Sequence, residues 1–272
     1  MLVWQKYTGS RWLGEHESAL KKLAGTRLAL ITRPDRKRTV VEIAALRHDA
    51  LRMFVRQFGG TIRKLSADWR CPVRLTKPIR VDPCLTIVNS RLQLPQIVRS
   101  RGCTTVMIPR SAAFGTGEHA TTAMSLRMLA RVSRQIRPGW RMLDLGTGSG
   151  ILALAARRLG AADAIAVDSD PTALSVAAAN ARLNKIDRIT FQCGDVRQLQ
   201  PAAVLEVVAA NLFSELLIEI LPRLTAARWL ILSGILRQQE SEIRCGLERH
   251  AFTAVETRRR GKWVALLAQK AG

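Results

Sequence analysis

The chain has 272 residues, of which 47% are hydrophobic and 24% charged, enough to form a substantial core in one large domain or two unequal ones. No apolar run reaches the length of a membrane span and the N-terminus lacks a signal-peptide pattern, so we expect a cytoplasmic protein. The formal net charge is +22, and residues 1–80 hold 18 Lys and Arg against 6 Asp and Glu. This balance favours RNA, a ribosomal particle or an acidic protein as a partner, unless it reflects an arginine-rich composition spread over solvated faces.

The five cysteines are odd in number and widely spaced: Cys71, Cys84, Cys103, Cys193 and Cys245. They form no Cys-x-x-Cys pair and do not cluster with the four histidines. The sequence therefore predicts neither a disulfide framework nor a metal site. We expect reduced thiols that are mostly buried.

Residues 1–68 alternate between strand and helix patterns. The predicted elements are a strand over 2–7, a helix over 15–23, strands over 27–32 and 39–43, a helix over 46–58 and a strand over 61–65. This β-α-β-β-α-β order predicts a small α+β ferredoxin-like domain, which we expect to bind or position a partner. Residues 69–101 lose periodicity and contain four prolines, so we predict a semi-rigid linker with one or two short strands.

A first glycine-rich loop, Phe-Gly-Thr-Gly-Glu-His-Ala-Thr-Thr, covers residues 114–122 and precedes a helix pattern. It is dense in groups that form hydrogen bonds, which is compatible with a ligand site. Taken by itself, the loop favours a structural role, in which Thr121 or Thr122 caps the helix.

A second glycine-rich turn follows the apolar strand that ends at Leu145 and contains Gly146, Gly148 and Gly150. Such a turn lets backbone N–H groups approach a ligand, although it can also serve tight packing alone. About 20 residues further on, the next strand ends at Asp168, the place where an acidic residue meets a ribose in nucleotide-type sites.

Strands and helices continue to alternate to the end of the chain. After a helix that Asp170 and Pro171 would start, we predict strands over 189–193, 204–210 and 229–232, a helix over 238–250, and a hairpin of 254–257 with 263–268. Residues 102–272 thus predict an α/β domain with a doubly wound sheet and a terminal antiparallel hairpin. The residues expected at the ligand-binding carboxyl ends of its strands are Asp144, Gly146, Asp168, Asp195 and Asn211.

The turn at 144–150 resembles the first motif of class I methyltransferases that bind S-adenosylmethionine. The chain more specifically resembles the ribosomal protein L11 lysine methyltransferase family, in the 114–122 loop and in segments 143–153, 167–171, 210–212 and 232–236. The resemblance implies a Rossmann-like catalytic domain, a substrate-recruiting domain over 1–68 and methylation of amino groups on that large-subunit ribosomal protein. Glu118 and Ala120 depart from the family's usual threonine and proline.

The resemblance also implies roles for individual residues. Thr122, Gly146, Asp168 and Asn211 would contact the cofactor, Asp168 through the ribose hydroxyls. The turn over 146–150 would face the methionine portion, and Asp144 and Gly148 are further expected cofactor contacts. Asp195, by comparison with class I enzymes, would approach the adenine amine or merely form a turn.

The acceptor side has three candidate residues, Asn211, His119 and Phe114, and no protein nucleophile is needed because the cofactor is already activated. Two alternatives stay open. The same chemistry could act on RNA or another protein, or the chain could be a non-catalytic module that binds RNA or the ribosome.

Overall fold

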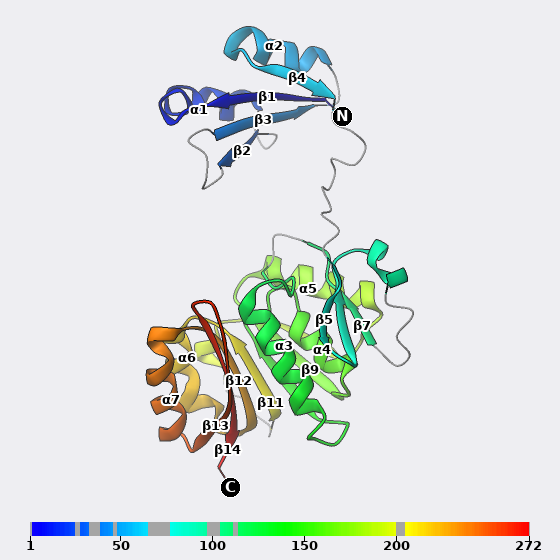
Figure 1. Cartoon of the computed structure of the whole chain (residues 1–272), viewed down its shortest axis with the longest axis vertical. Helices are drawn as coiled ribbons and strands as arrows, with labels where there is room; N and C mark the ends of the chain where they lie inside the picture. The colour runs from blue at the N-terminus through cyan, green and yellow to red at the C-terminus, as the bar shows by residue number, and fades with distance from the viewer. Residues whose placement is uncertain are drawn as a thin grey trace. The chain divides into compact units, whose positions relative to one another are not determined.

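The computed structural model describes residues 2–24, 28–32, 39–45, 48–64, 77–96, 104–110, 114–199 and 205–271. The chain divides into two compact units, residues 1–74 and 75–272 (Figure 1). Each unit has a hydrophobic core of its own. No helix in these described ranges is long and apolar enough to cross a membrane.

Unit 1 is an antiparallel sheet with two helices. Its elements are β1 (Leu2–Thr8), α1 (Ser10–Ala24), β2 (Leu28–Thr32), β3 (Thr39–Ala45), α2 (His48–Phe58) and β4 (Thr61–Lys64), in the sheet order β2-β3-β1-β4. Trp4 is fully buried, and its ring centroid lies 5.7 Å from that of Phe54 and 6.3 Å from that of Phe58. The apolar face of α2 therefore closes the core over β1. The element order matches the prediction, although α1 begins at Ser10 instead of Glu15.

Unit 2 is built on a seven-stranded sheet in the order β10-β9-β8-β11-β12-β14-β13. The strands are β8 (Arg141–Leu145), β9 (Asp163–Asp168), β10 (Ile189–Cys193), β11 (Leu205–Asn211), β12 (Ala227–Leu236), β13 (Phe252–Arg260) and β14 (Trp263–Lys270). The first five strands in that order are parallel, and β14 pairs antiparallel with both β12 and β13. The predicted doubly wound sheet with a terminal hairpin is confirmed. The central strand β11 is apolar because both of its faces are buried.

Helices cover both faces of this sheet (Figure 1). One face carries α3 (Ala120–Ser133), α4 (Ile151–Arg158) and α5 (Pro171–Asn184), and the other carries α6 (Ser214–Ile220) and α7 (Glu240–Arg249). The Asp170 cap of α5 is confirmed, since its side chain accepts a hydrogen bond from Thr172 N at 2.8 Å. The threonine cap of α3 is wrong, because His119 occupies the cap position and its side chain accepts no hydrogen bond from the helix backbone.

A small three-stranded sheet packs on the helices of unit 2. It consists of β5 (Ile79–Asp82), β6 (Leu85–Val88) and β7 (Thr104–Met107), with the 3₁₀ helix η3 (Arg91–Gln96) after β6. Val81, Leu85 and Ile87 are buried in the same core as α3 and α4. The second half of the predicted 69–101 linker thus belongs to unit 2, because β6 pairs in parallel with the more distant β7. Residues 69–76 and 97–101 lie outside the described residues.

The cysteines within the described residues are Cys84, Cys193 and Cys245, and all three are free and exposed. The prediction of mostly buried thiols is therefore wrong for these three, while Cys71 and Cys103 lie outside the described part. Within that part, no group of His, Cys, Asp and Glu side chains is arranged to hold a metal ion.

Candidate functional site

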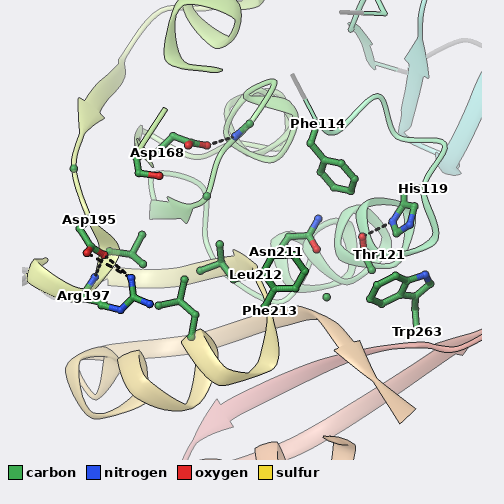
Figure 2. Close-up of a pocket in the computed structure, with 17 residues that line it drawn as sticks. Phe114, His119, Thr121, Asp168, Asp195, Arg197, Asn211, Leu212, Phe213 and Trp263 are labelled. Atoms are coloured by element: carbon green, nitrogen blue, oxygen red, sulfur yellow. Dashed lines mark hydrogen bonds and ion pairs between the residues drawn. The ribbon is translucent and has the colours of Figure 1, made fainter. Parts of the chain in front are cut away.

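A cavity of about 500 Å³ lies at the carboxyl ends of the parallel strands. It sits where β8 has β9 on one side and β11 on the other, which is the switch point of a doubly wound sheet. The predicted cofactor contacts that lie on its wall are Gly146, Gly148, Asp168, Asp195 and Asn211. Asp168 and Asp195 lie toward one end, and Phe114, His119 and Trp263 toward the other (Figure 2).

The two glycines of the turn after β8 that line the cavity, Gly146 and Gly148, leave little room for a side chain. Gly146 and Gly148 have φ angles of 69° and 54°, which L side chains rarely adopt. A Cβ on Gly146 would lie 2.5 Å from Leu212 Cδ2, and one on Gly148 would lie 2.6 Å from Phe114 O. The main chain of the turn therefore forms the cavity wall directly, without side chains in between.

Asp168 is held at the end of β9 with acceptor capacity to spare. Its Oδ2 accepts a hydrogen bond from Gly148 N at 2.9 Å, and its Oδ1 accepts one from Asp170 N at 3.0 Å. Each carboxylate oxygen can accept a second hydrogen bond. The side chain can thus take two hydroxyl donors from a ligand while the main chain keeps it in place.

Asp144 does not line the cavity. It is only 1% exposed, and its Oδ2 accepts hydrogen bonds from Thr147 Oγ1 at 2.7 Å and from Ala153 N at 3.2 Å. Burial raises the pKa of Asp144 to about 6, the two hydrogen bonds oppose that rise, and the nearby Asp168 charge adds to it. Asp144 therefore braces the glycine turn from behind.

Around Asp195 the cavity wall combines this carboxylate and the paired Arg197 side chain with apolar side chains. Asp195 Oδ1 accepts a hydrogen bond from Arg197 N at 2.9 Å, so Asp195 caps the 3₁₀ helix η4 (Val196–Gln198). This contact agrees with the alternative expectation that Asp195 forms a turn. Val196 and Leu216 complete the wall there. Sequence reasoning missed these two, since no motif distinguishes them from ordinary core residues.

The other end is aromatic. The His119 ring lies 5.3 Å from the rings of both Phe114 and Trp263, and its Nδ1 lies 2.8 Å from Thr121 Oγ1 (Figure 2). Phe213 also lines this cavity and is 76% exposed. Phe213 and Trp263 were not predicted as site residues.

Asn211 and the two threonines of the first loop differ in their positions. Asn211 lines the cavity at the end of β11, where its Oδ1 accepts a hydrogen bond from Ser233 Oγ at 2.9 Å. Thr121 lines the cavity as well. Thr122, the predicted contact, is buried in α3 away from the wall, and its Oγ1 has no partner among the described residues.

The chain is similar to one family of proteins over most of its length. The family model for ribosomal protein L11 methyltransferase (PrmA) matches residues 32–271. The ribosomal protein L11 methyltransferase of Pelobacter propionicus is 36% identical over 214 residues, covering 76% of this chain and 68% of the relative. That of Desulforapulum autotrophicum is 42% identical over 163 residues, covering 58% of this chain and 52% of the relative.

A solved structure gives the same comparison at the level of the fold. The ribosomal protein L11 methylase from Lactobacillus delbrueckii subsp. bulgaricus superposes with a TM-score of 0.61 and 26% sequence identity, covering 72% of this chain and 100% of that chain. Among these curated relatives, the matched part spans from 51% of the relative from Pelotomaculum thermopropionicum to 69% of the one from Stenotrophomonas maltophilia.

Proposed function

This chain belongs to the ribosomal protein L11 methyltransferase family, and we propose that it transfers methyl groups from S-adenosylmethionine to amino groups of ribosomal protein L11, lysine side chains among them. One observation carries the proposal. A single cavity joins a glycine turn and a ribose-type carboxylate to an open aromatic end formed by Phe114, Phe213 and Trp263.

The residues of the cavity fit S-adenosylmethionine. Asp168 would accept both ribose hydroxyls, a charge-assisted pairing that an amide would weaken. The exposed main chain at Gly146 and Gly148 leaves room for the amino-acid portion, and Val196 and Leu216 offer apolar contact to the adenine. When bound, the cofactor supplies an electrophilic methyl group on a sulfonium.

The chain's own contribution is alignment and exclusion of water. An in-line displacement needs the acceptor nitrogen about 3–3.5 Å from the reacting carbon. The aromatic end would hold a lysine side chain in that line, and its low polarity lowers the pKa of an incoming amine toward the neutral, nucleophilic form. The contact between His119 Nδ1 and Thr121 orients the imidazole, which forms part of this wall. We assign His119 no role in proton transfer.

Unit 1 would recruit the substrate. Its β-α-β-β-α-β order and antiparallel sheet support the ferredoxin-like assignment. Its helices expose Lys21, Lys22, Arg52 and Arg56. These cations suit an acidic partner surface or the RNA of a ribosomal particle.

The test is transfer of labelled methyl to purified ribosomal protein L11 from the same organism. We expect label with the wild type, and a loss of at least about tenfold in cofactor affinity for Asp168→Asn, because the amide keeps the shape but loses the charge. Asp163→Asn makes the same change at the opposite end of β9 and should behave as the wild type.

The outcomes separate the alternatives. Cofactor binding without label on the protein would refute the substrate assignment, and label that nuclease removes would favour RNA. Failure of the wild type to bind S-adenosylmethionine in calorimetry would refute the methyltransferase proposal and favour a non-catalytic binding module.

A further inference from the structure

A side chain outside the cavity holds the part of the first glycine-rich loop that precedes α3, residues 114–119. Asn89 follows β6, and its Nδ2 donates to Ile108 O at 2.8 Å, just after β7, and to Thr116 O at 3.0 Å, inside the loop. Both partners can only accept, which determines the orientation of the amide. We propose that Asn89 is a positioning residue for the acceptor side of the cavity, an inference that rests on the methyl transfer proposed above.

The opposite side of the loop is attached to the glycine turn. Ser149 N donates to Phe114 O at 2.9 Å, and Ser149 Oγ donates to Gly115 O at 2.6 Å. Ser149 is fully buried. The loop is thus fastened at Phe114 and Gly115 to the proposed cofactor turn, and at Thr116 to the small sheet through Asn89.

Packing also restrains the loop directly after these two attachments. Gly117 has a φ of 87°, and a Cβ there would lie 3.2 Å from Ile79 Cδ1, 3.3 Å from Ile151 Cδ1 and 3.5 Å from Ile87 Cγ2. The loop backbone therefore rests on β5, β6 and the first residue of α4. The segment predicted as a linker provides the support on which this loop is built.

The loop supplies two cavity residues, Phe114 and His119, whose rings face the aromatic end (Figure 2). The proposed cofactor contacts, Asp168 and the turn at Gly146 and Gly148, lie outside the loop. Removing the Asn89 donors takes away the hydrogen bond to Thr116 O, while the Ser149 bonds at Phe114 and Gly115 and the Arg110–Glu118 ion pair remain. Alignment of the acceptor should therefore suffer more than cofactor affinity, since small misplacements of reacting groups cost large rate factors.

The experiment compares Asn89→Ala and Asn89→Asp with Asn184→Ala. Asn184 is a matched control, because its Nδ2 donates to Met107 O and its Oδ1 accepts from Met107 N, both at 2.7 Å. It therefore bonds to the residue next to Ile108, the β7-side partner of Asn89, and no hydrogen bond joins it to the described residues of the loop. The measurements are hydrogen exchange of a peptide spanning 114–119, kcat and KM with ribosomal protein L11, and the Kd of S-adenosylmethionine.

We expect faster exchange in the loop and a kcat lower by about tenfold or more for both Asn89 variants, with the cofactor Kd within about threefold of the wild type. Asn89→Asp keeps the shape of the side chain and serves if the alanine variant does not fold. Asn184→Ala should leave loop exchange and kcat near wild-type values. Equal exchange and equal kcat in the Asn89 and Asn184 variants would overturn the inference. A wild type that transfers no methyl would instead refute the proposed function, while loop exchange would still test the role of Asn89.

Discussion

Asp144→Asn removes a charge from behind the glycine turn without changing the shape of the side chain. Asp144 is 1% exposed and accepts hydrogen bonds from Thr147 Oγ1 and Ala153 N. Both hydrogen bonds reach the same oxygen, Oδ2, so an asparagine that places its Oδ1 there can accept from Thr147 Oγ1 and from Ala153 N. The substitution therefore isolates the cost of burying a carboxylate.

That cost follows from the pKa of Asp144, which burial raises from 3.8 to about 6. The pKa of Asp144 is higher in the folded protein than in the unfolded chain, so protonation of this carboxyl stabilises the fold. That stabilisation is fully present below about pH 4 and is lost as the pH rises through about pH 6. At neutral pH the ionised carboxylate lowers the free energy of unfolding by about 3 kcal/mol, and about 2 kcal/mol of this loss develops between about pH 4.5 and about pH 7.5.

The assay is urea unfolding of the wild type and Asp144→Asn at both pH values, followed by circular dichroism. The difference between the two proteins removes the titrations that they share, including those of unit 1. We expect the wild type to lose about 2 kcal/mol relative to the variant as the pH rises over this range. A difference that stays constant within about 0.5 kcal/mol would refute the reasoning that burial dominates this pKa.

Two further substitutions test the cavity wall. Gly148→Ala places a Cβ 2.6 Å from Phe114 O, so calorimetry should record at least about a tenfold loss of S-adenosylmethionine affinity. Gly139→Ala, at a φ of 97° with nothing within 4 Å, should retain that affinity, and equal losses would contradict a specific role for the turn. Phe213→Ala changes a side chain that is 76% exposed, so the free energy of unfolding should change by less than about 0.5 kcal/mol while KM for ribosomal protein L11 rises. An unchanged KM would remove Phe213 from the acceptor side.

The sequence alone predicted the local structure that depends on residues close together in the chain. Asp170 before Pro171 predicts a helix start, and the structure has that cap. The almost wholly apolar run over 204–210 predicts a strand buried on both faces, and the corresponding strand β11 lies in the centre of the sheet. Glycines directly after a strand, with Asp168 at the end of the next, predicted one edge of the cavity, because parallel strands bring their carboxyl ends together.

Only the tertiary structure decided which other residues join them. Trp263 reaches the cavity from a hairpin far along the chain, and Asn89 reaches the loop at Thr116 from a segment whose prolines predicted a linker. Thr121 and Thr122 are adjacent and chemically identical, so only the direction in which α3 leaves the loop sets which one faces the cavity. Hydrophobic periodicity predicts which face of its own helix or strand a residue occupies. Packing between elements that are distant in the sequence determines which other residues it contacts.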